Sequence, residues 1–477
     1  MRARGDALFG ACLFALALVP RLYVALAWAG EPVWDGHYYD FGARRIAQGL
    51  GYSDDLTIAG TLVWHPWCHY PVGYSAVLAL FYRLLGSGPS IAAVLDSLTG
   101  AALAVVTWAL ARHALSPLRA RIAGSIVALH PGLVLYSALV MSEPLAALLT
   151  LTAFWLAVRD ASWRRGLVLG ALVLGLAALV RPQALLCAPF LGLLNRKTGR
   201  REGLLPALFP SSRLPVFSSL LPVVAACAIA LLPVLPWTAR NCRVMDACAL
   251  VSTNAGWNLA IGAFPRATGR FETLRASDGC PVVSGQVQQD RCWFDYGVHQ
   301  IAAHPWHWLK LVPAKLGFTF DHESFAVEYL HEARPEAWPE SARRTARDVT
   351  TLAHRLLLAA AALGCVAFPN FRRPRGSIAQ SATLGVAAGL VALAFAADTP
   401  VFWPIAVFAA VVPWLPFSGR PDVPPALLLG IALLATTVVT HAVFFGEDRY
   451  HVVVTPVLAL LAAGALRARH TASSAVC

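Results

Sequence analysis

The sequence predicts an all-α protein, a polytopic transmembrane helical bundle with about twelve spans. Hydrophobic residues make up 57% of the 477 residues and charged residues only 13%, whereas soluble domains contain about 45–50% and about 25%. The apolar residues also fall in runs of roughly membrane-crossing length, which short polar segments separate. These observations exclude an ordinary soluble domain.

The apolar runs follow one another along most of the chain, and several are shorter than the ~20 residues that an untilted crossing needs, which indicates tilted or kinked helices. They cover residues 7–29, 91–110, 122–140, 145–158, 167–180, 184–194, 220–237, 350–368, 378–397, 401–417, 426–445 and 452–466. The first run imitates a cleavable signal, because Ala27-Trp28-Ala29 resembles a cleavage site. We expect a retained first span, since Asp35 follows it so closely that the helix would position this acid.

The charge pattern predicts the orientation of these spans. Lys+Arg 38 against Asp+Glu 26 gives +12, and the basic residues are concentrated in short loops such as 195–201 and 371–376. This pattern fits the positive-inside rule and lacks the basic stripe expected of a nucleic-acid partner. Both termini are then cytoplasmic, provided that residues 69–85 and 304–320 lie on the membrane. If either segment crosses, every later turn changes sides.

Three regions follow from this topology. They are an N-terminal core over residues 1–237 with a first outer loop at 30–89, an extracytoplasmic loop region at 238–349, and a C-terminal block at 350–477. The loop region contains Cys242, Cys248, Cys280 and Cys292, an even set that is compatible with disulfides in an oxidising compartment. Gly166 and Gly170 form a GxxxG pattern, which predicts close helix packing.

The first outer loop begins with a polar, aromatic segment at residues 32–52. Its apolar residues recur at roughly helical spacing and its basic residues take the other side, so we expect short helices lying on the membrane surface. Asp35 stands at the start of this segment. It is either a functional acid or the N-cap of the helix, and both roles are compatible.

The topology brings a set of polar groups to the outer face. This set comprises Asp35, His37, Asp40, His65, His69, Asp96, Glu143, Arg181, Asp448 and Arg449. A charge at the centre of a span costs about 2.5–3.5 kcal/mol on insertion scales, so such groups are usually functional or paired. The convergence therefore predicts a site at this face.

Several of these residues also have simpler interpretations. Glu143 precedes Pro144 and is suited to capping the next span, Arg181 is suited to snorkelling or structural pairing, and residues 447–450 resemble an ordinary charged turn. His65 and His69 have the i,i+4 spacing of a metal pair, but a proline at residue 66 argues against a continuous helix. Asp54-Asp55 is expected in a solvated turn. No Walker loop or GxGxxG is present, so no nucleotide cofactor is expected.

Six segments resemble, in order and spacing, the bacterial GT-C polytopic glycosyltransferases, which include protein O-mannosyltransferases and the aminoarabinose transferase of lipid A. They read WDGHYYDFGARRIAQGLGY, HYPVGYSAVLALFYRLLG, MSEPL, VRPQALL, STNAGWNLAIGAFPRATG and EDRYHVVVTPVLALLAAG. The resemblance covers most of the chain, and residues 271–348 match least. It implies a catalytic acid at Asp35, a second acid at Glu143 and basic residues for a lipid phosphate. The chain departs from the family at Gly36, where an acid is frequent, and at Tyr70, where a basic residue is usual.

The resulting hypothesis is an inverting membrane glycosyltransferase that moves a hexosyl or pentosyl unit from a polyprenyl-phosphate donor to a hydroxyl of a lipid, glycan or protein. The reaction is expected at the outer face of the cytoplasmic (inner) membrane, among the lipids of the cell envelope. Asp35 is the expected base, and Arg181, Arg449 and Tyr450 the donor-phosphate contacts. Glu143 is the candidate ligand of a divalent cation, Mg or Mn.

Two other classes fit parts of the pattern. A secondary transporter or lipid flippase also places charges within spans, but transporters often have repeated halves and broken helices at the midplane, and no repeat is evident here. A non-catalytic scaffold explains the long outer loop and leaves the convergent charges unexplained.

Overall fold

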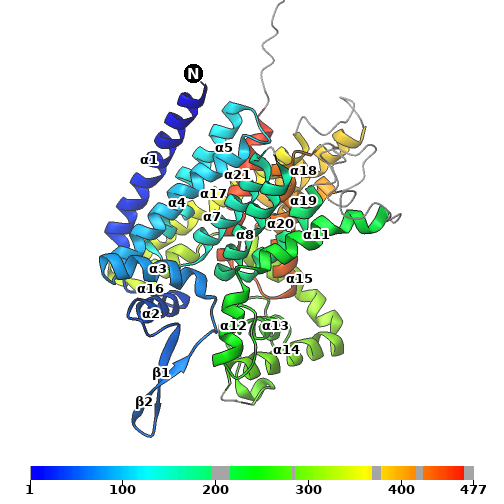
Figure 1. The fold of residues 1–477 in the computed structure, drawn as a ribbon. Coiled ribbons are helices and arrows are strands. Elements are labelled where there is room, and N and C mark those ends of the chain that lie inside the picture. Colours follow the sequence, from blue (N-terminus) through cyan, green and yellow to red (C-terminus); the bar gives the residue numbers. More distant parts are fainter. Residues whose placement is uncertain are drawn as a thin grey trace, which may run out of the picture.

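The computed structural model describes residues 2–160, 162–194, 215–281, 285–367, 378–414 and 423–466. Long helices run side by side through most of the molecule (Figure 1). Helices α2, α3, α12, α13 and α14 and a β-hairpin gather at one end of this bundle, opposite the N-terminal end of α1. This end carries the candidate site.

The first half of the described chain is a series of helices with one hairpin. Its elements are α1 (Arg2–Trp28), α2 (Asp35–Ala47), β1 (Ser53–Ile58), β2 (Thr61–Pro66), α3 (Val72–Leu85), α4 (Pro89–Ala111), α5 (Pro117–Leu129), α6 (Pro131–Leu135), η1 (Tyr136–Ala138), α7 (Glu143–Arg159), α8 (Trp163–Val180), η2 (Pro182–Cys187) and α9 (Ala188–Leu193).

The second half is also helical. Its elements are α11 (Pro215–Leu231), α12 (Leu235–Val244), α13 (Ala255–Ile261), η4 (Ala276–Asp278), α14 (Gln286–Ala303), α15 (Pro305–Phe320), α16 (Phe325–Ala333), η5 (Pro335–Ala337), α17 (Glu340–Ala367), α18 (Ile378–Ala396), α19 (Trp403–Val411), η6 (Val412–Trp414), α20 (Pro425–Val443), η7 (Asp448–Val453) and α21 (Thr455–Ala465).

Five helices of the described chain are long and apolar enough to cross a membrane, and the number rises to seven if each of two bent pairs is one span. The five are Arg4–Trp28, Pro89–Ala111, Trp163–Val180, Glu340–Val366 and Pro425–Val443. These helices agree with the predicted polytopic bundle, and the count of about twelve stays a prediction. The basic segments 195–201 and 371–376 lie outside the described residues.

One bent pair consists of α5 and α6, which meet at an angle of 52°. The bend lies at Pro131, which has no N–H for the carbonyl of Val127 one turn earlier. The fully buried Arg21 of α1 supplies the missing donors, from Nη2 to the Val127 oxygen at 3.0 Å and from Nη1 to the Ala128 oxygen at 2.6 Å. A charged side chain inside the first span therefore completes the backbone pairing of a neighbouring helix.

The GxxxG pattern packs as predicted. A side chain at Gly166 or Gly170 would meet the backbone of α7, at the carbonyl oxygens of Ala157 and Ala153. The two glycines therefore let α7 and α8 approach closely.

The all-α prediction misses one element, because β1 and β2 form an antiparallel two-stranded sheet. Asp54 and Asp55 lie on β1, not in the expected solvated turn. Asp54 contacts His65 on β2 at 2.7 Å, and Asp55 pairs with Arg45 of α2 at 2.8 Å. The turn falls instead at Ala59-Gly60, where both residues have positive φ angles of 50° and 83°, a conformation that glycine adopts without steric cost.

Residues 237 and 349, where the sequence predicts changes of region, lie inside α12 and α17. Helix α17 begins with charged turns and continues into apolar ones with no glycine or proline before Gly364. A helix continues through such a change of hydropathy, because its backbone bonds do not depend on which side chains are polar.

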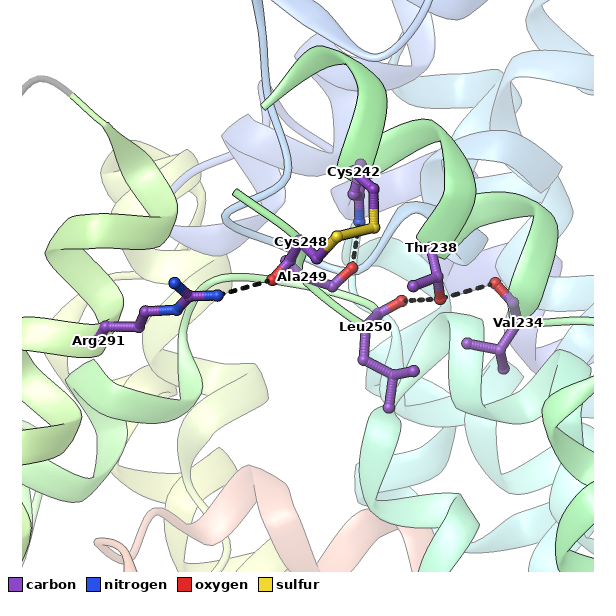
Figure 2. The surroundings of a disulfide bond; sticks show 8 residues. Val234, Thr238, Cys242, Cys248, Ala249, Leu250 and Arg291 are labelled. Carbon is purple, nitrogen blue, oxygen red and sulfur yellow. Dashed lines mark hydrogen bonds between the residues drawn. A yellow bond between two sulfur atoms is a disulfide. The ribbon is translucent and has the colours of Figure 1, made fainter. Parts of the chain in front are cut away.

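All four cysteines of the loop region form disulfides, Cys242–Cys248 and Cys280–Cys292, which agrees with the expectation from their even number. Figure 2 shows the first disulfide beside the segment that follows it. Thr238 of α12 donates to the Leu250 carbonyl at 2.8 Å. The bridge and this hydrogen bond fasten residues 248–250 to the end of α12, and the next residues enter the candidate site.

Candidate functional site

A cavity of about 660 Å³ opens where α2, the end of α8, α13, the end of α20 and η7 meet. Its polar lining residues include Asp35, His69, Arg181, Arg449 and Tyr450. Apolar side chains such as Leu186, Leu250, Ile261, Phe444 and Phe445 line the rest. The cavity therefore combines an acid, two arginines and an apolar wall.

Asp35 is the first residue of α2, and the N-cap position belongs to Trp34, which makes no side-chain cap. The N-cap interpretation of Asp35 is therefore wrong. Trp34 has a φ of 49°, which is costly for a residue with a bulky side chain. Its indole packs against Phe325 and Tyr329 of α16, with ring centroids 5.5 and 5.8 Å apart. This packing holds the turn that directs Asp35 toward the cavity.

Both carboxylate oxygens of Asp35 have partners. The hydroxyl of Tyr70 donates to Oδ1 at 2.7 Å, and Nη1 of Arg449 donates to Oδ2. Burial alone would raise the pKa of Asp35, but the charge of Arg449 and these hydrogen bonds lower it below its ordinary value. Asp35 is therefore an ionised carboxylate whose basicity Arg449 suppresses.

Arg181 connects the cavity to the second predicted acid. It lies between the last turn of α8 and Pro182, lines the cavity, and donates from Nη2 to Oε1 of Glu143. Glu143 is fully buried in the first turn of α7 and, within the described chain, is not part of the cavity lining. The second acid thus pairs with Arg181 and does not itself line the cavity.

Arg449 and Tyr450 belong to η7. The Arg449 guanidinium lies 5.1 Å from the Tyr450 ring centroid, and that of Arg181 lies 5.5 Å away from it. The Tyr450 ring also stacks on His441 at 4.1 Å. Tyr450 therefore contacts both arginines and helps to position them beside the cavity.

Glu447 is a third acid near the site. Its Oε2 lies 2.6 Å from Nε of Arg449. Burial raises the pKa of Glu447 to about 7, although the charge of Arg449 acts in the opposite direction. Near neutral pH, Arg449 thus has one fully ionised partner, Asp35, and one that titrates.

Of the other predicted polar residues, only His69 lines the cavity. Asp40, Asp96, Asp448 and His65 have polar partners elsewhere in the described chain. Asp40 accepts from Tyr82 and Arg44, and Asp96 accepts from Tyr74 at 2.7 Å. Asp448 accepts from the Phe325 amide at 2.8 Å and from Ser324. His65 contacts Asp54, and His37 is exposed. Asp40, Asp96 and Asp448 thus connect helices, whereas His65 pairs with Asp54 and His69 lines the cavity.

Sequence reasoning missed part of the lining. Tyr70, noted only as a departure from the family pattern, donates to Asp35, while Trp257 and Asn258 of the STNAGWN segment and His441 also line the cavity. Gly36, the other departure, has a packing reason, because a side chain there would meet the hydroxyl of Tyr329 and the carbonyl of Val140. Trp257 and Asn258 belong to one of the six segments that resemble the GT-C family, but the resemblance assigned no role to either residue.

The cavity does not fit the predicted cation site at Glu143. Asp35 and Glu143 are each neutralised by an arginine, whereas Mg²⁺ and Mn²⁺ prefer several free oxygen ligands. In the described ranges, the group of three side chains with converging metal-ligand atoms is Glu323, His354 and His451. That group offers three converging ligand atoms of the types that metal ions bind.

No protein-family model matches the sequence, and no curated protein matches it. Among solved structures, the chain is similar to the archaeal oligosaccharyltransferase AglB from Archaeoglobus fulgidus, with 14% identity, a TM-score of 0.43 and coverage of 96% of this chain and 50% of AglB. The chain thus spans about half the length of that protein. It is also similar to ArnT from Cupriavidus metallidurans, with 15% identity, a TM-score of 0.35 and coverage of 97% and 78%. Both neighbours are GT-C glycosyltransferases, the class that the sequence motifs resemble.

Proposed function

We propose that the chain is a membrane glycosyltransferase that transfers a sugar from a polyprenyl-phosphate donor to a hydroxyl acceptor. The proposal rests on one observation: Asp35, Arg181 and Arg449 line the same cavity, each held by a partner. A carboxylate suits the removal of a hydroxyl proton, and guanidinium groups suit a phosphate. The apolar wall of Leu186 and Phe444 suits the first isoprene units of a lipid.

In the proposed reaction, the acceptor oxygen attacks the anomeric carbon of the donor sugar. A carbon–oxygen bond to the acceptor forms, the bond to the phosphate oxygen breaks, and the acceptor proton passes to Asp35. Arg181 and Arg449 neutralise the charge that develops on the departing lipid phosphate. A single displacement inverts the anomeric configuration.

The Asp35–Arg449 pair suggests how donor binding prepares the base. While Arg449 pairs with Asp35, the carboxylate is a poor proton acceptor, because the guanidinium lowers its pKa. A donor phosphate competes for the same guanidinium. Its negative charge would draw Arg449 away and raise the pKa of Asp35, so that the base becomes effective only when the donor is present.

The disulfides support an outward-facing site in the cytoplasmic membrane. Residues 250–252, 254–255 and 257–258 line the cavity and lie in the chain between Cys248 and Cys280, which belong to different disulfides. Disulfides persist in the periplasm or outside the cell. The disulfides thus support a cavity that faces an oxidising compartment, where the donor would be supplied from the membrane. The proposed role of Glu143 is to hold Arg181, and no step uses a metal ion.

Mass spectrometry of envelope glycolipids and glycoproteins tests this function. A strain that lacks the chain is compared with strains that carry the wild type or Asp35→Asn. We expect one sugar to disappear in the deletion strain, to return with the wild type and to stay absent with Asp35→Asn. An unchanged set of glycoconjugates, with altered lipid or solute transport, would instead favour the transporter or flippase class.

A further inference from the structure

Four titratable side chains meet in the interior, away from the cavity lining. They come from four places in the chain: His130 between α5 and α6, Glu323 between α15 and α16, His354 on α17 and His451 on η7. Each side chain is at most 4% exposed. No role in the proposed transfer reaction uses this cluster.

The ligand atoms converge on one carboxylate oxygen. Oε2 of Glu323 lies 3.4 Å from Nε2 of His451, 3.8 Å from Nε2 of His130 and 3.9 Å from Nδ1 of His354. In a tetrahedral zinc site with bonds of about 2.0–2.1 Å, neighbouring ligand atoms are about 3.3 Å apart. The three distances to Glu323 approach this value, and the ligand atoms of Glu323, His354 and His451 all lie within 4.8 Å of one another.

Two of the histidines are held with a lone pair directed at the cluster. Nδ1 of His451 lies 2.8 Å from the carbonyl of Thr319, and Nε2 of His354 lies 2.9 Å from the carbonyl of Phe320. A ring nitrogen that donates to a carbonyl carries the proton, so in the neutral imidazole the opposite nitrogen is an acceptor. Metal-binding histidines are oriented by this type of second hydrogen bond.

The converging atoms have no hydrogen-bond partner within the described chain. These atoms are Oε2 of Glu323, Nδ1 of His354, Nε2 of His451 and both ring nitrogens of His130. Buried polar atoms without partners are unfavourable. A water molecule has two hydrogens and cannot donate to three acceptors at once, whereas a cation contacts all three.

The backbone around Glu323 is also fixed. Thr350 on α17 donates to the Glu323 carbonyl at 2.5 Å, and the Glu323 amide donates to Thr351 at 3.2 Å. Gly132 packs against the carboxylate, where any side chain would collide with it. The carboxylate therefore has little freedom to turn away from the histidines.

We propose that Glu323, His354 and His451, with His130 as the fourth ligand, bind one Zn²⁺ ion. Imidazole nitrogen with one carboxylate oxygen favours zinc and similar transition metals over Mg²⁺ or Ca²⁺. The site is closed to solvent, as structural zinc sites are. The ion ties η7 to α17 and to the turn before α16. Since η7 also contains Arg449, the metal would hold this arginine in register with Asp35.

Metal content of the full-length protein in detergent tests the proposal. The purified chain is stripped with chelator, reloaded with ZnCl₂ and analysed by mass spectrometry. We expect about one zinc per wild-type chain and less than about 0.2 in His354→Ala and His451→Ala. His65→Ala is the matched control, because it removes a histidine outside the cluster, and it should keep its zinc. Equal zinc in His354→Ala and the wild type would overturn the proposal.

A second measurement needs no variant and remains decisive if the alanine variants fail to fold. The stripped wild type is titrated with Co²⁺, whose tetrahedral complexes absorb visible light strongly, and its melting temperature is recorded with and without Zn²⁺. We expect saturable absorption at about one Co²⁺ per chain and a higher melting temperature with Zn²⁺. Absence of both effects in the folded wild type would refute the site, whatever the transferase activity.

Discussion

Replacing Asp35 by asparagine separates the catalytic role of this residue from its structural contacts. Asparagine keeps the size of the side chain, and its oxygen still accepts from Tyr70 or Arg449. Arg449 also retains Glu447, whose Oε2 lies 2.6 Å from Nε, so the buried guanidinium keeps an acidic neighbour. We therefore expect nearly unchanged folding.

The kinetic effect should be large and asymmetric. A general base typically contributes about 10²–10⁴-fold, so kcat should fall by that factor in Asp35→Asn. The same change frees Arg449 from its competitor, so KM for the lipid donor should stay the same or fall. A merely structural role would instead lower the melting temperature and raise KM.

The assay is sugar transfer by purified protein in liposomes that contain a polyprenyl-phosphate sugar, with kcat, KM and melting temperature measured for each variant. Asp96→Asn is the matched control, because Asp96 is also a buried carboxylate with a tyrosine partner, Tyr74 at 2.7 Å, but lies outside the cavity lining. It should transfer sugar at the wild-type rate. Turnover of Asp35→Asn within about threefold of the wild type, at an equal melting temperature, would remove Asp35 from the mechanism.

Three further predictions concern stability, pH and topology. Arg181→Ala leaves Glu143 buried and unpaired, which should lower the free energy of unfolding by about 3–5 kcal/mol. Adding Glu143→Gln should restore most of the melting temperature but not the donor affinity. Recovery of both would argue against a phosphate contact at Arg181. Because the folded protein raises the pKa of Glu447 from its ordinary 4.5 to about 7, this group's contribution to stability is present below pH 4.5 and is lost as the pH rises through 7. This loss amounts to about 3 kcal/mol at most. Between pH 5 and 8 the melting temperature should therefore fall more in the wild type than in Glu447→Gln. Equal falls in the two proteins would contradict a raised pKa at Glu447. Asp278→Cys should react with a membrane-impermeant maleimide from outside the cell, and labelling only after the membrane is opened would reject the proposed topology.

The sequence alone determined the class of the protein and the location of its acid. Hydrophobic runs, short basic loops and an even set of cysteines are local properties, and they predicted a helical membrane bundle with disulfides in one loop region. Asp35 could be singled out because an acid directly after an apolar span is costly unless it is solvated or used. Gly166 and Gly170 likewise predicted close packing, because their spacing along a helix is fixed by its geometry.

Only the tertiary structure decided which polar groups share a site. Asp35 and Arg449 lie 414 positions apart, and no local pattern pairs them. Asp40, Asp96 and Asp448 looked equivalent to Asp35 in the sequence, yet they accept hydrogen bonds that join helices. His130, Glu323, His354 and His451 stood in four unrelated segments and converge only in the fold. The physical reason is that hydropathy fixes which segments enter the membrane, whereas ion pairs and ligand clusters depend on the rotation and depth of each packed helix.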